Sequence, residues 1–262
     1  MFIIAERING MFKDVKEAIR ERNAKVIQDL ALRQQAAGAY ALDVNVGPAV
    51  ADAHSALLWL VETIRAVTDI PLAIDTAKWD VMKAVIPCVP GKKIINSTKA
   101  DMEIATEYVG LAVENGAALV GLTIDADGVP GNVEKRVELG AQLAAAAMDG
   151  GLALTDLFID PIILPVNVSP KSPGHCLQAI SQLRALSDPP PHVLLGLSNV
   201  SQRCSNRNLI NRTYLAMCIA HGLDSAILDS LDTELVDSAI TAELLSDKMI
   251  YCDSYLKAAR PG

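Results

Sequence analysis

Residues 193–200 read V-L-L-G-L-S-N-V, a short apolar run that ends in a serine and an asparagine. The apolar part has the composition of a buried β-strand, and Ser198 and Asn199 give its end a polar character. The same pattern recurs along the chain, and it predicts eight strands. They are residues 2–9, 40–47, 71–76, 93–98, 118–125, 157–164, 193–200 and 224–230.

Longer amphipathic stretches separate these runs. Helical spacing of apolar residues is clear in residues 24–37, 55–67, 103–114, 134–148 and 234–245. Strands that alternate with helices pair in parallel through right-handed crossovers. Eight such units in 262 residues predict a (β/α)8 TIM barrel that forms a single domain over residues 1–262. The alternative is an open doubly wound sheet, which usually carries a G-x-G-x-x-G turn that this sequence lacks.

The composition excludes several classes of protein. The net charge is −8 and no basic block is present, which argues against a nucleic-acid-binding protein. No apolar run reaches the ~18 residues of a membrane-spanning helix, and the opening M-F-I-I-A-E-R does not resemble a signal peptide. Five cysteines without a C-x-x-C pair fit a reducing cytoplasm, and four scattered histidines predict no protein-bound metal.

Nearly every predicted strand ends in polar residues. They are Glu6, Arg7, Asn9, Asp43, Asn45, Asp75, Asn96, Thr123, Asp125, Asp160, Ser198, Asn199 and Asp229. All strand carboxyl ends of a parallel barrel lie at one mouth, where active sites form. Any one of these residues could instead cap the following helix, Asp125 has the setting of a turn residue, and Asp229 could be an N-cap or a core acid. Their recurrence favours one shared polar site.

The chemistry of this set suits recognition rather than nucleophilic attack. It is rich in Asp and Asn, and no Ser or Cys lies at a recognisable spacing from a base. Carboxylates accept paired N–H bonds from an aminopyrimidine, and an amide both donates and accepts. The set therefore suggests a pterin or purine-like ligand.

Seven segments carry a more specific resemblance. They are E-R-I-N-G (6–10), L-D-V-N-V-G-P (42–48), I-N-S-T (95–98), G-L-T (121–123), D-P-I-I-L-P (160–165), G-L-S-N-V-S-Q (196–202) and N-R-N-L-I-N-R (206–212). With these segments the whole chain resembles the methyltetrahydrofolate:corrinoid/iron–sulfur-protein methyltransferases. That group belongs to the pterin-binding barrel family, together with dihydropteroate synthase and the folate domain of cobalamin-dependent methionine synthase.

The resemblance implies roles for the matched residues. Those expected to hold the pterin ring are Asp75, Asn96 and Asp160, and Asn199 is expected to approach N5, the methylated nitrogen. Gly196 and Ser198 are expected to shape the same wall, Arg207 to contact the folate tail or the corrinoid partner, and Asn9, Asp43 and Asn45 to form the floor of the site.

The implied activity is methyl transfer between N5 of 5-methyltetrahydrofolate and the cobalt of a corrinoid (a cobalamin). Departure of the methyl group leaves negative charge on N5 unless that nitrogen gains a proton or a strong hydrogen bond. Our hypothesis is a direct displacement in which Asn199 donates to N5 and Asp160 belongs to the network that supplies the proton. These two residues are the candidate catalytic residues.

The corrinoid is expected to come from a separate protein. The usual D-x-H-x-x-G ligand motif is absent, because D-A-H-S-A-L (52–57) has leucine in place of glycine, so His54 is predicted to be a surface or packing residue. Arg203 and Arg207 are candidates to offset the acidic balance near an anionic folate. The resemblance also implies a homodimer.

Three alternatives stay open at this point. The transfer could run from a methylated corrinoid protein to tetrahydrofolate in a demethylation pathway. The enzyme could perform a dihydropteroate-synthase-like pterin condensation, although I-A-E-R-I-N-G and L-S-N-V-S-Q do not match the loops which that reaction uses. The chain could also be a non-catalytic pterin-binding subunit.

Overall fold

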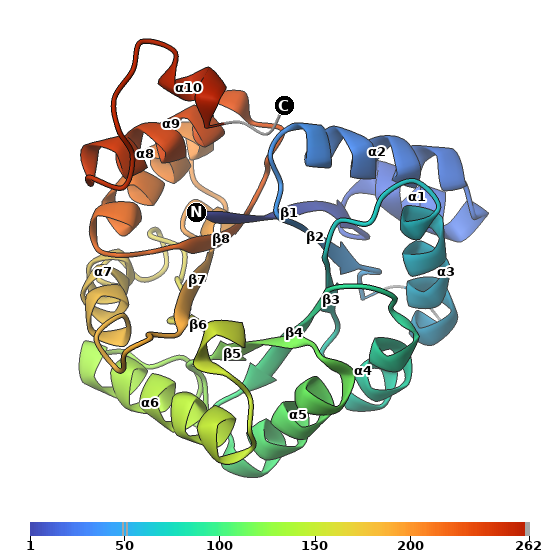
Figure 1. Ribbon diagram of the computed structural model, residues 1–262, viewed down its shortest axis with the longest axis horizontal. Helices are drawn as coiled ribbons and strands as arrows, with labels where there is room; N and C mark the ends of the chain where they lie inside the picture. The colour runs from blue at the N-terminus through green and yellow to red at the C-terminus, as the bar shows by residue number, and fades with distance from the viewer. Residues whose placement is uncertain (49, 51, 260–262) are drawn as a thin grey trace.

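The computed structural model describes residues 1–48, 50 and 52–259. Its strands close into a parallel barrel in which each strand pairs with its neighbours in the sequence and β8 pairs with β1 (Figure 1). The strands are β1 (Phe2–Asn9), β2 (Ala41–Asn45), β3 (Leu72–Asp75), β4 (Lys93–Lys99), β5 (Ala118–Leu122), β6 (Leu157–Asp160), β7 (His192–Gly196) and β8 (Ser225–Leu228). The predicted (β/α)8 barrel is confirmed, with one strand in each of the eight predicted ranges. Three predicted strands are too long, because 118–125 ends at Leu122, 157–164 at Asp160 and 193–200 at Gly196.

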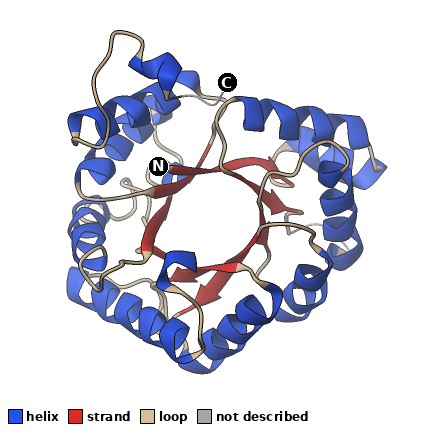
Figure 2. Ribbon diagram, in the orientation of Figure 1, coloured by secondary structure: helices blue, strands red, loops and turns tan. Residues whose placement is uncertain are grey.

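Helices surround the barrel on all sides (Figure 2). They are α1 (Lys13–Glu21), α2 (Ala24–Ala36), α3 (Ala53–Arg65), α4 (Trp79–Val85), α5 (Met102–Asn115), α6 (Val133–Asp149), α7 (Ser172–Leu183), α8 (Arg207–Ala220), α9 (Thr233–Leu245) and α10 (Tyr255–Ala258). Short 3-10 helices are η1 (Ile86–Cys88), η2 (Leu154–Asp156) and η3 (Leu197–Asn199). The five predicted helices correspond to α2, α3, α5, α6 and α9. No helix within the described ranges is both long and apolar enough to cross a membrane.

The inside of the barrel is a packed apolar layer. Its buried members come from seven of the strands, and they are Ile4, Ala41, Ala73, Ile94, Val120, Phe158 and Leu194. Side chains of a strand alternate between its two faces, so the residue two positions further along each strand faces the barrel axis again. Those positions carry Glu6, Asp43, Asp75, Asn96, Leu122, Asp160 and Gly196. The apolar layer is therefore the floor beneath a mostly polar mouth.

The other face of each strand packs against the helices. Residues such as Leu42, Val44 and Ile74 are fully buried and belong to one large cluster with apolar residues of the helices. Burial of apolar surface contributes about 25 cal/mol per Å² to folding. Two apolar layers thus stabilise the barrel. Because the mouth is not needed for this burial, its residues can be polar.

Two irregularities in strand pairing lie at the mouth. On β1 the register shifts between Ala5 and Ile8, so Glu6 and Arg7 form a bulge. On β4 it shifts between Asn96 and Thr98, which leaves Ser97 as the extra residue. Bulges re-aim side chains and are common at barrel rims.

The connections after β1 and β2 approach each other closely. A Cβ on Gly10 would lie 2.1 Å from the carbonyl oxygen of Val46, and Gly47 has a φ of +75°. The Gly10 amide donates to the Asn45 carbonyl at 2.8 Å. Glycine at these two positions lets the rim close beside Asn45.

Candidate active site at the barrel mouth

Four predicted residues lie on three adjacent strands and contact one another. Asp43 lies in the middle of β2 and Asn45 ends it, Asp75 ends β3, and Asn96 lies on β4 opposite Asp75 in the strand register. The Asn96 Nδ2 donates to Asp43 Oδ1 at 3.0 Å. The Asn45 Nδ2 donates to Asp75 Oδ2 at 2.5 Å, and Asn45 Oδ1 accepts the Gly47 amide at 2.6 Å. Each carboxylate of this group thus has an asparagine donor.

The two carboxylates are buried close together, which changes their acidity. Burial raises the pKa of Asp43 well above its ordinary value, the charge of Asp75 raises it further, and the Asn96 hydrogen bond opposes the shift. Burial also raises the pKa of Asp75, against the lowering effect of Asn45. Because the charge of Asp75 acts on Asp43, the two carboxylates resist simultaneous ionisation, so this side of the mouth readily retains a proton.

Asp160, Gly196 and Asn199 form the facing side of the mouth. Asp160 Oδ1 accepts the backbone amide of Ile162 at 2.7 Å. A Cβ placed on Gly196 would lie 3.0 Å from Asn199 Nδ2 and 4.0 Å from Asp160 Oδ2, so both side chains converge above this glycine. Burial raises the pKa of Asp160 to about 6, against the hydrogen bonds from the backbone of Ile162 and Gly196. A side chain at this position would enter that space and press on the Asn199 amide.

Glu6 joins the two sides. The sequence places it among the polar residues at the strand ends, but the resemblance implies no role for it. Its Oε1 accepts the hydroxyl of Ser198 at 2.7 Å. Burial raises the pKa of Glu6, and the Ser198 hydrogen bond opposes this. Glu6 also contributes to the raised pKa of Asp43. The signal in the sequence was its position two residues after Ile4, on the inner face of β1.

Arg207 lies at the rim, at the first position of α8. Its Nη2 donates to the Ser198 carbonyl at 3.2 Å and its Nε to Ser201 Oγ at 3.1 Å. Arg207 remains exposed, so it can contact a ligand above the mouth. Arg203 is also exposed, at a φ of 61°.

Asn9 ends β1 opposite Asn45, but its side chain is engaged locally. Its Oδ1 accepts the Met11 amide at 2.9 Å, which fixes the turn after β1. Asn9 is therefore at the mouth, with one side-chain atom committed to the loop.

Three further interpretations can be compared with the structure. Asp125 accepts the Asp127 amide at 3.0 Å, as expected of a turn residue. Asp229 accepts the Leu231 amide at 3.0 Å and adds to the raised pKa of Glu6. His54 is exposed, as predicted. Among the described residues, no group of three His, Cys, Asp or Glu side chains could hold a metal ion.

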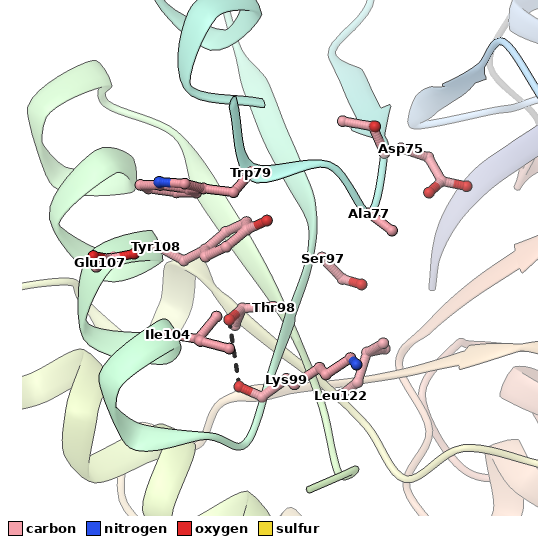
Figure 3. Close-up of a pocket in the computed structure, with 11 residues that line it drawn as sticks. Asp75, Ala77, Trp79, Ser97, Thr98, Lys99, Ile104, Glu107, Tyr108 and Leu122 are labelled. Carbon is pink, nitrogen blue, oxygen red and sulfur yellow. Dashed lines mark hydrogen bonds between the residues drawn. The ribbon is translucent and has the colours of Figure 1, made fainter. Parts of the chain in front are cut away.

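A cavity of about 390 Å³ adjoins this group at Asp75. Figure 3 shows Asp75 on one side of it and Trp79, Tyr108 and Glu107 on the other. It lies between the end of β4, the connection after β3, and α5. The mouth thus continues into a side cavity beyond the strands.

A model of the pterin binding enzymes matches residues 10–229, most of the chain. The chain belongs to the pterin-binding enzymes. This confirms the resemblance to the pterin-binding barrel family and the prediction that the protein is an enzyme. The matched range contains Asp43, Asp75, Asn96, Asp160 and Asn199, which the barrel brings to one mouth.

Relatives of this pterin-binding enzyme are found among curated proteins. The chain is 29% identical over 264 residues to the methylcorrinoid:tetrahydrofolate methyltransferase of Eubacterium limosum, with 100% of this chain and 97% of the relative covered. It is also 29% identical over 240 residues to the methionine synthase of Mycobacterium leprae (strain TN). That match covers 87% of this chain and 20% of the synthase, so the chain spans about a fifth of the larger enzyme.

Solved structures agree on the fold. The dihydropteroate synthase of Yersinia pestis, solved with a pterine-sulfa conjugate, superposes with a TM-score of 0.68 at 14% identity, covering 95% of this chain and 94% of that one. The enzyme of Xanthomonas albilineans in complex with 7,8-dihydropteroate gives 0.67 at 18% identity, with 94% of each chain covered. At such identities the likeness establishes the barrel fold alone.

Proposed function

We propose that this pterin-binding enzyme transfers a methyl group between N5 of 5-methyltetrahydrofolate and the cobalt of a corrinoid carried by another protein. The observation that carries the proposal is the convergence of the Asn199 amide and the Asp160 carboxyl above Gly196. A hydrogen-bond donor and a weak acid thus share one space. The end-to-end similarity to the methylcorrinoid:tetrahydrofolate methyltransferase supports the same function.

The polar residues of the mouth suit the pterin ring. Asp75 and Asp160 offer carboxylate acceptors on opposite sides, for the amino group and ring N–H groups of the pterin. Asn96 is held by its bond to Asp43, which gives its amide a fixed orientation in the mouth. The apolar layer beneath, including Ile94 and Phe158, excludes water from the lower side of the ring. These residues would bind the ring and fix its rotation.

Asn199 is proposed to act on N5. When the carbon–nitrogen bond breaks, the electron pair stays on N5, which becomes strongly basic. A donor placed at this atom stabilises the developing charge, and one such donor is worth about 10²–10³-fold in rate. The amide nitrogen of Asn199 faces the open space above Gly196, as this role requires.

Asp160 is proposed to take part in proton supply. An acid whose pKa is about 6 is partly protonated near neutral pH, which is the condition for efficient general acid catalysis. Its Oδ1 is committed to Ile162, while its Oδ2 faces Gly196. Because the Asp160 carboxyl also faces the ring N–H groups, the proton that N5 needs can pass from its protonated form through water.

The corrinoid partner is proposed to cover the mouth. The cobalt must come within bonding distance of the methyl carbon that N5 carries, so the corrinoid's carrier has to contact the connections that surround the barrel axis. Exposed apolar side chains lie on those connections at Met11, Phe12 and Val168, and on the first turn of α8 at Leu209. Their exposure supports a partner that docks on this face.

The direction of transfer depends on which methyl donor and acceptor the enzyme is supplied with. The same transition state is crossed both ways, so the residues above serve both directions. The name of the Eubacterium limosum relative writes the transfer from methylcorrinoid to tetrahydrofolate, which supports that direction. A homodimer and a cytoplasmic location stay predictions, and the free thiols of all five cysteines fit a reducing compartment.

The test is methyl transfer between 5-methyltetrahydrofolate and free cob(I)alamin, followed in both directions by corrinoid absorbance. Asn199→Ala should lower the single-turnover rate about 10²–10³-fold at saturating folate. The matched control is Asn23→Ala, because Asn23 is exposed and its side chain caps no helix. An unchanged rate in Asn199→Ala would remove this residue from the chemistry, and folate binding without transfer would indicate a binding subunit.

A further inference from the structure

The side chain of Asn199 depends on its backbone for its position. Among the residues that the structure describes, none makes a hydrogen bond with this side chain. Asn199 ends η3, a single turn that the amide of Val200 closes by donating to the carbonyl of Leu197 at 3.1 Å. The place of the Asn199 amide above Gly196 is therefore set by whatever fixes η3.

Ser198, the middle residue of η3, is held by two other elements. Its hydroxyl donates to Glu6 Oε1 at 2.7 Å, and its carbonyl accepts Arg207 Nη2 at 3.2 Å. Arg207 follows in the next helix, whereas Glu6 lies 192 residues earlier, on β1. The side chain of Glu6 reaches over the end of β8, which pairs with both β1 and β7. The Glu6–Ser198 bond thus ties η3 to the far side of β8.

The carboxylate of Glu6 has a fixed place because the bulge that carries it is fixed. Glu6 and Arg7 form the bulge of β1, and a bulge changes the direction in which its side chains point. The backbone amide of Arg7 donates to Oε1 of Gln34 at 2.9 Å, and Gln34 is fully buried on α2. The guanidinium of Arg7 donates to Asp14 at 2.7 Å. The bulge is therefore held from the helix side while Glu6 faces the mouth.

From these contacts we propose that Glu6 is a positioning residue for methyl transfer, which holds η3 through the Ser198 hydroxyl and so places the Asn199 amide at N5. The inference rests on the proposed function and adds a residue to its mechanism. A hydrogen bond to a carboxylate is shorter and stronger than one between neutral groups, so it restricts the turn more tightly. Because other residues bind the pterin ring, loss of this bond should lower the rate of transfer and leave the affinity for folate.

The charge of Glu6 can be separated from its hydrogen bond. Burial raises the pKa of Glu6, the Ser198 hydrogen bond opposes this, and the charges of Asp229 and Arg207 act in opposite directions. Glu6 in turn adds to the raised pKa of Asp43. Glu6→Gln removes the charge from this group and keeps an oxygen that can accept the Ser198 hydroxyl. Glu6→Ala removes both.

The test measures two quantities for each variant: the single-turnover rate with free cob(I)alamin at saturating 5-methyltetrahydrofolate, and the Kd for that folate. Glu6→Ala and Ser198→Ala should each lower the rate by about 10–10²-fold, as expected for a displaced catalytic group, with a Kd near that of the wild type. Glu6→Gln should retain most of the rate. The double variant Glu6→Ala/Ser198→Ala should be no slower than Glu6→Ala, because both changes remove the same bond.

The matched control is Glu114→Ala. Glu114 is an exposed glutamate near the end of α5, so this change removes the same side chain far from η3. Its rate and Kd should equal those of the wild type. Ser198→Ala removes a single hydroxyl from a half-buried turn, so it decides the question even if Glu6→Ala does not fold.

The outcomes separate this inference from the proposed function. A wild-type rate in Ser198→Ala, or additive losses in the double variant, would overturn the positioning role of Glu6 while methyl transfer itself stands. A rate in Glu6→Gln as low as that of Glu6→Ala would also overturn it, because the charge and not the bond to Ser198 would then matter. Absence of methyl transfer by the wild-type enzyme would instead contradict the proposed function.

Discussion

Asn96 donates its side-chain amide to the buried carboxylate of Asp43 at 3.0 Å. This bond connects β4 to β2 across β3, at the level of the mouth where Asp75 also lies. Burial and Asp75 both raise the pKa of Asp43, so its ionised form depends on this donor. Protonation of Asp43 is therefore linked to the position of the Asn96 side chain in the pterin site.

Replacement of Asn96 by Ala should destabilise the fold in a pH-dependent manner. A buried carboxylate that loses its donor costs about 1–3 kcal/mol in the free energy of unfolding. The loss should shrink as pH falls, because a protonated Asp43 needs the amide less. Urea unfolding of wild type and variant at pH 5 and pH 8 measures this difference. A pH-independent loss would indicate that packing, and not the hydrogen bond, is what Asn96 supplies.

Gly196→Ala should impair transfer while leaving stability nearly intact. Gly196 has a φ of −71°, which alanine adopts without strain, but its methyl group would lie 3.0 Å from Asn199 Nδ2. Displacement of that amide by about 1 Å can cost on the order of 10²-fold in rate. The matched control is Gly174→Ala in α7, where an added Cβ meets no atom within 4 Å. A wild-type rate in Gly196→Ala would show that Asn199 is not tightly placed.

The ionisation of Asp160 should appear in both stability and binding. Its pKa is about 6 in the folded protein because burial raises it from 3.8, so the unfolded chain releases this proton first. The contribution to stability is therefore full below about pH 4 and is lost as pH rises to about pH 6, on the order of 3 kcal/mol in total. Asp160→Asn keeps an acceptor for the Ile162 amide and should flatten this slope.

Binding of the pterin should show the opposite trend. Ring N–H donors favour the ionised carboxylate, so the affinity for folate should fall as pH drops below about 6. Calorimetry of folate binding from pH 5 to pH 8 measures the midpoint, and Asp160→Asn should bind weakly at every pH. A midpoint that persists in Asp160→Asn would assign the titration to Glu6, Asp43 or Asp75 instead.

Much of the mouth could be predicted because its residues follow simple periodicities. Polar residues end apolar runs, parallel strands share one carboxyl end, and Asp43 and Asn45 are two residues apart on one face. Glu6 obeys the same rule, since it lies two residues after the inward-facing Ile4. The bulge at Glu6 and Arg7 interrupts the alternation in β1, and the register of a single strand cannot be read from its own sequence.

Other features depend on contacts between distant segments. Trp79 opens α4 and Tyr108 lies on α5, the helices that precede and follow β4, so their rings meet only in the folded barrel. Arg136 sits within the apolar pattern of α6, and its partners are carbonyl groups 25 and 26 residues further along the chain. Neither contact leaves a pattern in the neighbouring sequence, so both could be found only in the tertiary structure.

Arg136 supports Asp160 from below, and its replacement should move the titration of that acid. The side chain is 1% exposed and donates to the carbonyls of Pro161, Ile162 and Asn132 at 2.8, 3.3 and 3.3 Å. Ile162 has a φ of 57°, and its amide binds Asp160. The Arg136 charge also lowers the pKa of Asp160 against the effect of burial. The guanidinium thus fixes the loop after β6 and stabilises the ionised form of Asp160.

Arg136→Met should therefore raise the midpoint of the pH dependence of folate binding above about 6 and lower the free energy of unfolding by about 3 kcal/mol, since several buried carbonyls lose their donor. Arg136→Lys keeps the charge with fewer donors, so its midpoint should stay near that of the wild type while the stability still falls. Calorimetric titration across the pH range, on variants whose folding is confirmed by circular dichroism, measures both quantities. If Arg136→Met folds and binds folate with an unshifted midpoint, the charge of Arg136 does not reach Asp160 and the residue serves only to hold the loop.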